Sequence, residues 1–501
     1  IIFWSRLPIM LLAVLFGWLL FAWTRRRFGD AAALLTLTFF AFSPTILAHS
    51  RFVTTDLGAA FGFFIGIASF IAFLEKPTRR TIIIAGILLG IAQLLKFSVV
   101  LLAPMYAVLI AGWIYALPNL YIRERLRATI SLITKTLVIG AIGILVIWIA
   151  YVPLVARYPA ERQLRDAEFL LGSYGFRPAV QFDLALIRTP VTRPLGQYIL
   201  GVLMVQQRSA GGNTAFFLGE VSGAGSRLYF PLMYLLKEPL ALYVLTLITL
   251  MIGLARVTAR ATSESALARL RRWIYDHFVQ FASIAVIAIY WAISIKSPLN
   301  IGVRHILPTF PFIYLLISRE IALWLAPAQQ GTVIPATLRA WLGSVYHQYI
   351  AVIPKYIVVG LLILWLIIST LTTFPHFLSY YNELAGGSRN GWRIAVDSNY
   401  DWGQDLKRLV QYMDKNKIQK ISLDYFGGAD PRYYLGDRFE AWQSSKGPAH
   451  GIFAISSSFR QGAFGATASG FTRKPENSYL WLRPYQPIAQ IGNSIFVYNL
   501  P

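Results

Sequence analysis

The sequence FSPTILAHSRFVTTDLGAAF, residues 42–61, joins two runs of residues that are almost wholly apolar, at about 31–47 and 57–74. A helix rises 1.5 Å per residue, so about 20 apolar residues cross the roughly 30 Å of hydrocarbon in a bilayer. The stretch therefore predicts two membrane-embedded segments joined by a short polar turn. This turn contains a histidine, an arginine and a lone aspartate.

The composition of the whole chain agrees with a membrane protein of many spans. Of 501 residues, 56% are hydrophobic and only 14% are charged, and the mean hydropathy is +0.55. The net charge is +23. Because the basic residues cluster between apolar runs, we relate this charge to topology and anionic lipid and expect no nucleic-acid partner. The absence of cysteine excludes disulfides and thiolate metal sites.

Ten apolar runs predict ten visible spans. They lie at about 7–23, 31–47, 57–74, 81–95, 98–116, 136–152, 232–254, 278–295, 303–325 and 350–374. Alternation then puts the basic gaps on one side, which the positive-inside rule identifies as cytoplasmic. These gaps are TRRRFGD (24–30), EKPTRR (75–80), YIRERLRATISLITK (121–135), ARVTARATSESALARLRRW (255–273) and the segment 326–349. The short runs 31–47 and 81–95 leave tilted or re-entrant segments open.

The other side receives every chemically unusual stretch. These are the gap 48–56, the turn at Lys96, an outer loop at 153–231, the gap KSPLNIGVRH (296–305) and the segment from about 375. We therefore expect an all-α polytopic membrane domain over 1–374 and a small extracytoplasmic α/β domain over 375–501. Helical spacing follows Asp401 and Gln404, which form a capping-box-like start, and strand-like runs lie at 421–425, 452–455, 479–482 and 495–498.

The first run descends from outside to inside. An inward-facing N-terminus would then require a further upstream span and an outer loop, so we expect the chain to be a fragment.

Asp56 precedes an apolar run, where a carboxylate can cap a helix N-terminus. It also shares one short outer loop with His49 and Arg51, and ionisable groups at a membrane face often mark substrate paths. A carboxylate and an imidazole there could bind a divalent metal ion or a sugar hydroxyl. Both interpretations of Asp56 stay open on the sequence.

Cations interrupt or flank the apolar runs at Lys96, Lys237, Arg304 and His305. Each could be a snorkelling side chain that ends a span. Alternatively, each could hold the phosphate of a lipid headgroup, and the Arg304 guanidinium suits that role best because it can bind phosphate in bidentate fashion. Several cations on one face favour an anionic lipid ligand over an ion channel.

The stretch DSNYDWGQD, residues 397–405, resembles a calcium loop but fails the EF-hand pattern. Its glycine comes one position late, at Gly403, and Arg408 occupies the twelfth position, where a bidentate glutamate is required. We interpret the stretch as a turn followed by a helix cap. No GxxxxGK[ST], HExxH or GxSxG motif supports ATP-driven transport, zinc proteolysis or serine hydrolysis.

Five stretches together resemble the bacterial and archaeal relatives of the dolichyl-phosphate-mannose protein mannosyltransferases. They are SPTILAHSRFVTTDL (43–57), LLGIAQLLKFS (88–98), AFFLGEVSGAGSRLYFPLMYLLKEP (215–239), SPLNIGVRHILPTFPF (297–312) and FLSYYNELAGGSRNGWRIAVDSNYDWGQDL (377–406). The resemblance implies a membrane glycosyltransferase of the GT-C fold. Such enzymes take a sugar from a polyprenyl phosphate on the non-cytoplasmic face and pass it to a protein, glycan or lipid acceptor, with inversion.

The resemblance also implies roles for the residues above. The main base of such enzymes lies in an outer loop after the first span, which we expect upstream of Ile1. Asp56 would then be the second acidic residue, which positions the carrier phosphate, with Mg²⁺ or Mn²⁺ as a candidate cofactor. The carrier or phosphate contacts would be His49, Arg51, Lys96, Lys237, Arg304 and His305. Glu220 and Tyr229, with Lys237, would line a groove between the outer loop and the membrane.

Two hypotheses from other classes stay open. A flippase for lipid-linked sugars would require polar or broken segments within several spans and internal pseudo-symmetry. A non-catalytic membrane scaffold would bind a glycan or partner through its outer domain.

Overall fold

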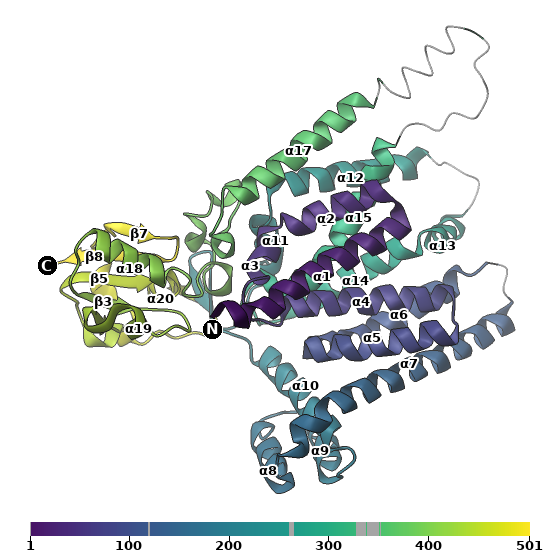
Figure 1. The fold of residues 1–501 in the computed structure, drawn as a ribbon, viewed down its shortest axis with the longest axis horizontal. Helices are drawn as coiled ribbons and strands as arrows, with labels where there is room; N and C mark the ends of the chain where they lie inside the picture. Colours follow the sequence, from purple (N-terminus) through teal and green to yellow (C-terminus); the bar gives the residue numbers. More distant parts are fainter. Residues whose placement is uncertain (1, 119–120, 260–264, 327–336, 338–349, 351) are drawn as a thin grey trace.

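The computed structural model describes residues 2–118, 121–259, 265–326, 337, 350 and 352–501. Long helices form an elongated bundle, and a small α/β part lies at one end of it (Figure 1). The predicted fold class, a mostly helical membrane domain with a small C-terminal α/β part, is confirmed.

The bundle consists of helices that run between its two ends. They are α1 (Ile2–Phe28), α2 (Asp30–Ala41), α4 (Asp56–Glu75), α5 (Arg79–Leu95), α6 (Leu102–Ala116), α7 (Ile122–Ala156), α12 (Leu240–Ala259), α14 (Phe278–Lys296), α15 (Phe310–Leu325) and α17 (Ile353–Leu371). Shorter helices lie at the ends: α3 (Pro44–His49), η1 (Phe97–Leu101), α11 (Tyr229–Lys237), α13 (Ala266–Asp276) and η2 (Val303–Thr309).

The expectation of ten spans is too high for the described part of the chain. Seven helices there are long and apolar enough to cross a membrane, or eight if α11 and α12, bent by 108° relative to each other, form one broken span. The run 81–95 forms the 17-residue helix α5. The expected cytoplasmic segment 326–349 falls almost wholly outside the described residues.

Two of the expected spans are interrupted for identifiable reasons. The run 31–47 splits into α2 and α3, where the Ser43 hydroxyl accepts a hydrogen bond from the Ile46 N–H and Pro44 is the first residue of α3. The run 232–254 bends at Glu238 and Pro239, because proline has no N–H to continue a helix.

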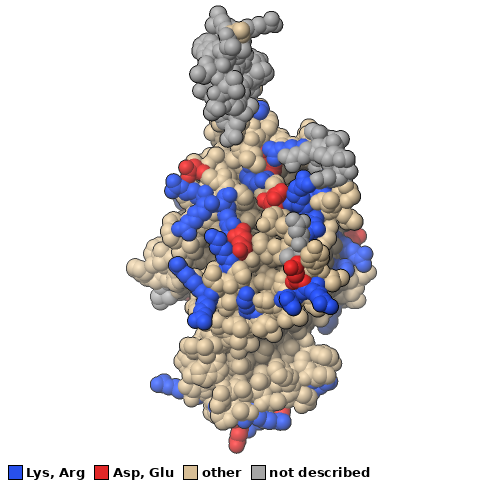
Figure 2. Space-filling view, turned by 90° about the vertical axis from the view of Figure 1, so that its right-hand side faces the viewer, with Lys and Arg blue, Asp and Glu red and all other residues tan. Residues whose placement is uncertain are grey.

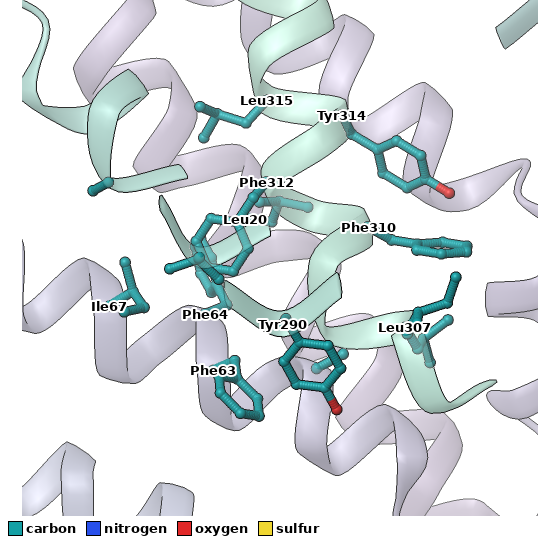
Figure 3. Packing of buried hydrophobic residues seen from close by; sticks show 14 of the residues in the cluster. Leu20, Phe63, Phe64, Ile67, Tyr290, Leu307, Phe310, Phe312, Tyr314 and Leu315 are labelled. Carbon is teal, nitrogen blue, oxygen red and sulfur yellow. The ribbon is translucent and has the colours of Figure 1, made fainter. Parts of the chain in front are cut away.

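Helix α4 forms the centre of the bundle, and 89% of its span is buried. Figure 3 shows Phe63, Phe64 and Ile67 of α4 close to Leu20 of α1 and Tyr290 of α14. This packing excludes lipid from all sides of α4. The N-terminus of α4 is therefore fixed at the centre of one end of the bundle.

The outer loop predicted at 153–231 is largely folded. It contains α8 (Ala160–Leu170), α9 (Arg177–Arg188), α10 (Arg193–Gly211), β1 (Ala215–Phe217) and β2 (Glu220–Ser222). Strand β2 pairs in parallel with β6 (Ala466–Thr467) of the C-terminal part. The hairpin of the outer loop, β1–β2, and strand β6 of the C-terminal part thus form one small sheet.

The C-terminal part is built on a five-stranded sheet of order β4-β3-β5-β8-β7. The strands are β3 (Ile421–Asp424), β4 (Phe439–Ala441), β5 (Gly451–Ser456), β7 (Ala489–Ile491) and β8 (Ile495–Leu500), with helices α18 (Leu406–Lys415), α19 (Pro431–Leu435) and α20 (Ser457–Phe464). Strand β3 is parallel to its neighbours, whereas β5 and β7 are antiparallel to β8. The strand predicted at 479–482 is wrong. Tyr479 has a φ of 43°, which is not an extended conformation, and Leu480–Leu482 form a 3-10 turn.

Basic side chains gather on the end of the bundle that faces away from the C-terminal part. Figure 2 shows this end, where blue Lys and Arg outnumber red Asp and Glu. The last turn of α1 contributes Arg25, Arg26 and Arg27, and the first turn of α5 contributes Arg79 and Arg80. The positive-inside rule predicts that this end is cytoplasmic.

The C-terminal part docks on the loop before η2 through a short turn, η7 (Asp397–Asn399). The Ser398 hydroxyl donates to the Ile301 carbonyl at 2.6 Å, and the Val303 N–H donates to Asn399 Oδ1 at 2.9 Å. A Cβ on Gly302 would lie 2.3 Å from Ser398 Oγ. The close approach of the two segments therefore requires glycine at this position.

We predict that Gly302→Ala destabilises the protein by about 1–3 kcal/mol, because the added methyl group displaces the Ser398 hydroxyl from its hydrogen bond. Thermal unfolding of the purified protein in detergent measures this. Gly360→Ala in α17 is the matched control, since its Cβ would meet no atom within 4 Å, and it should be neutral or stabilising. In a Gly302→Ala/Ser398→Ala double variant the two costs should not add, and simple additivity would contradict this account.

Candidate functional site

Asp56, the first residue of α4, is 2% exposed and accepts hydrogen bonds from two cations. Lys96 Nζ lies 2.6 Å from its Oδ1, and Arg304 Nη1 lies 3.0 Å from its Oδ2. Lys96 follows the last residue of α5, and Arg304 belongs to η2. The structure thus brings three predicted residues from three distant segments together at the centre of one end of the bundle.

An aromatic side chain of the C-terminal part covers this cluster. The Arg304 guanidinium lies over the Trp402 ring, 4.7 Å from its centroid. The rings of His49 and Phe52 meet Trp402 edge-on, at centroid distances of 5.6 and 5.3 Å. Trp402 therefore joins the C-terminal part to the polar turn between α3 and α4.

The cluster has an excess of positive charge. Burial lowers the pKa of the His49 imidazole to about 3, so this group is neutral near pH 7. The remaining charges are one carboxylate, on Asp56, and two cations, on Lys96 and Arg304. Lys96 and Arg304 keep 23% and 19% of their side chains exposed. The cluster can therefore receive an anion from outside.

The cluster does not suit a divalent metal ion. Two cations already occupy both oxygens of Asp56, and a metal ion there would be repelled by both. Within the described ranges, no group of three or more His, Asp or Glu side chains could hold a metal ion. The expected Mg²⁺ or Mn²⁺ therefore does not fit Asp56 in this arrangement.

Lys237 makes its side-chain hydrogen bonds to the C-terminal part and none to Asp56, Lys96 or Arg304 among the described contacts. Its buried ammonium donates to the carbonyls of Leu378 and Asn399, both at 2.7 Å, and lies 4.6 Å from the centre of the Tyr381 ring. The adjacent Glu238 accepts a hydrogen bond from Ser43 at 2.8 Å. These contacts give Lys237 a structural role, and none of them supports the predicted contact with a carrier phosphate.

The other predicted residues lie around the cluster or away from it. Arg51 Nη1 donates to the Pro375 carbonyl at 3.5 Å, and His305 follows Arg304 in η2 beside Phe230. Tyr229 is buried, and its hydroxyl accepts from Asn399 Nδ2 at 2.7 Å.

Glu220 is exposed at the start of β2, the strand that pairs with the C-terminal part. No contact found in the described chain joins Glu220 to Asp56.

The stretch DSNYDWGQD (397–405) reaches the cluster, which its sequence pattern did not predict. Interpreting the stretch as a turn was correct for η7, but Trp402 reaches the cation cluster and Asp397 has a φ of 55°. The one feature of the sequence that could have indicated this contact is a tryptophan, Trp402, among polar residues. The expected capping box of Asp401 with Gln404 is wrong, because α18 begins only at Leu406. Asp401 Oδ1 accepts a hydrogen bond from the Gly403 N–H at 3.1 Å, and Gln404 Oε1 accepts one from the Trp402 N–H at 2.7 Å.

Known proteins resemble the chain at the level of family and, weakly, of structure. No curated protein sequence matches it. Residues 2–149 match the family described as dolichyl-phosphate-mannose-protein mannosyltransferase. The expected resemblance to this family is confirmed, and it supports a function of the glycosyltransferase type. The matched segment includes Asp56 and Lys96 of the cluster.

Two crystal structures of ArnT from Cupriavidus metallidurans are also similar to the chain. The structure bound to undecaprenyl phosphate has a TM-score of 0.39 at 13% identity, and the apo structure has 0.38 at 11%. Both alignments cover 98% of this chain and 83% of the ArnT chain.

We predict that Lys237→Met lowers stability by about 2 kcal/mol or more, because it removes two charge-assisted hydrogen bonds and leaves two buried carbonyls unsatisfied. Limited proteolysis should also become faster near residue 375, where the C-terminal part is no longer held. Lys415→Met at the exposed end of α18 is the control and should change the stability by less than about 0.5 kcal/mol. Equal proteolysis rates in wild type and Lys237→Met would contradict the structural role.

Proposed function

We propose that this protein transfers a sugar from a polyprenyl-phosphate carrier to an acceptor hydroxyl. The observation that carries the proposal is the buried convergence of Lys96 and Arg304 on Asp56, in a chain whose residues 2–149 match a glycosyltransferase family. The acceptor is a protein, glycan or lipid. We place the reaction at the membrane face that carries the C-terminal part, and we assign this face to the outside because the opposite end is basic.

The electrostatics of the cluster suit a lipid phosphate. Its formal charge is one unit positive, and its cations are partly exposed at the end of an apolar bundle. A phosphate headgroup there would meet a guanidinium and an ammonium, while its polyprenyl chain stays in the hydrocarbon. Charge–charge attraction is stronger at this partly desolvated site than in water.

The reaction requires one bond to form and one to break. The acceptor oxygen attacks the anomeric carbon from the side opposite the phosphate, the bond from this carbon to the phosphate oxygen breaks, and the configuration inverts. The hydroxyl proton passes to a general base, and the carrier phosphate leaves with an additional negative charge. Lys96 and Arg304 stabilise that charge as it develops. Because both oxygens of Asp56 already accept hydrogen bonds from cations, we assign Asp56 to positioning them.

We predict that Asp56→Ala and Arg304→Ala each abolish sugar transfer without loss of expression in the membrane. Arg304→Lys should retain only a small part of the activity, because an ammonium cannot bind phosphate in bidentate fashion. The assay incubates the full chain in lipid vesicles with defined polyprenyl-phosphate sugars and measures labelled sugar on the acceptor and release of the carrier phosphate.

Arg432→Ala, at an exposed position of α19, is the control and should transfer at the wild-type rate. Wild-type rates in both Asp56→Ala and Arg304→Ala would exclude the cluster from the reaction. Movement of intact lipid-linked sugar across the vesicle membrane, without transfer, would instead indicate a flippase.

A further inference from the structure

A cavity of about 140 Å³ lies where three parts of the chain meet. The C-terminal part, the hairpin of the outer loop and the loop before η2 all contribute to its wall. An engineered apolar cavity of about 150 Å³ in another protein binds benzene, which has one six-membered ring. The lining residues are Thr214, Ala215, Phe216, Val221, Tyr229, Asn300, Ile301, Val396, Asp397, Phe426, Ser458, Phe459 and Gly462.

The lining combines aromatic rings with hydroxyl, amide and carboxylate groups. Phe426 and Phe459 meet edge to face, with ring centroids 5.5 Å apart. No lysine, arginine or histidine is among the described residues of the wall. The cavity therefore does not suit a phosphate. An apolar surface beside hydrogen-bonding groups suits a neutral ring that carries hydroxyl groups.

Asp397 is held in an unfavourable backbone conformation in this wall. Its φ of 55° lies in the left-handed region, which is uncommon for residues other than glycine. Its N–H donates to Ser458 Oγ at 3.1 Å, and its carbonyl accepts from the Tyr400 N–H at 2.7 Å. Such conformations persist where surrounding contacts enforce them, and they cluster at ligand sites. Here the contacts fix the backbone of Asp397 in the wall of the cavity.

Trp402 connects the cavity to the cation cluster. Its indole N–H donates to Asp397 Oδ1 at 3.3 Å, while its ring lies against the Arg304 guanidinium. A single side chain thus contacts a wall residue of the cavity and a proposed phosphate ligand. In the proposed reaction the sugar is bonded to the phosphate, and the contacts of Trp402 are the observation that relates the cavity to the cation cluster.

We propose that this cavity is a sugar subsite in which the Asp397 carboxylate accepts a hydrogen bond from a ring hydroxyl and Phe459 packs against the ring. This inference rests on the proposed function and adds where a pyranose binds. The sugar is either that of the donor or a sugar on the acceptor, since both present the same chemistry to the wall.

Direct binding tests the proposal without any transfer reaction. The full chain is purified in detergent and titrated with methyl glycosides of mannose, glucose, galactose and N-acetylglucosamine, with saturation-transfer NMR as the readout. At least one glycoside should bind wild type. Asp397→Asn, which keeps the size and tolerates the left-handed φ, should weaken that binding about tenfold by removing a charge-assisted hydrogen bond. Phe459→Ala should weaken it as well.

The control variant is Asp437→Asn, at an exposed position of the C-terminal part, which should bind the glycoside as wild type does. Inorganic phosphate should not displace the glycoside, because the wall has no cation among its described residues. Binding by Asp397→Asn and Phe459→Ala at wild-type strength would overturn the proposal, and so would the failure of every glycoside to bind wild type. Thermal unfolding of each variant shows whether it is folded.

A transfer assay then distinguishes the two sources of the sugar. If Asp397→Asn raises KM for the polyprenyl-phosphate sugar, the cavity holds the donor sugar; if it raises KM for the acceptor, the cavity holds the acceptor. Absence of transfer by wild type with every donor would refute the proposed function. Glycoside binding that depends on Asp397 would still establish the subsite in that case.

Discussion

The buried pairing of Asp56 with Lys96 and Arg304 is the constraint on which the rest of this end of the molecule depends. A carboxylate taken out of water is costly unless cations and hydrogen bonds compensate it. Here the compensation comes from the end of α5 and from η2, so three segments must meet at the N-terminus of α4. Helix α4, which begins at Asp56, is buried by the surrounding helices. The two cations stay partly exposed at this end of the bundle.

The C-terminal part completes the site as well as covering it. Trp402 lies over Arg304, and the η7 turn that precedes it is fixed by Gly302, Ser398 and Asn399. The outer loop contributes as well, since β2 pairs with β6. Trp402 thus contacts both Arg304 of the cation cluster and Asp397 in the wall of the cavity.

Two lysines with similar sequence contexts have different roles. Lys96 and Lys237 both interrupt apolar stretches, and both were expected to contact the carrier. Lys96 forms an ion pair with a carboxylate and stays partly exposed. Lys237 is buried and donates hydrogen bonds to two backbone carbonyls that lie more than 140 residues away in the chain. Periodicity and spacing cannot distinguish these cases. The difference depends on which distant backbone atoms fold against each ammonium.

The sequence by itself determined that this is a membrane protein and what its class of fold is, because the lengths of apolar runs and the positions of basic gaps are local features of the chain. It also indicated the candidates Asp56, Lys96 and Arg304. Only the tertiary structure showed that these three meet, that Lys237 donates to two distant backbone carbonyls and that Trp402 contacts both Arg304 and Asp397. It also showed that the run 232–254 bends by 108°. These properties are contacts between residues far apart in the chain, and a local pattern carries no information about which partner a buried polar group will find.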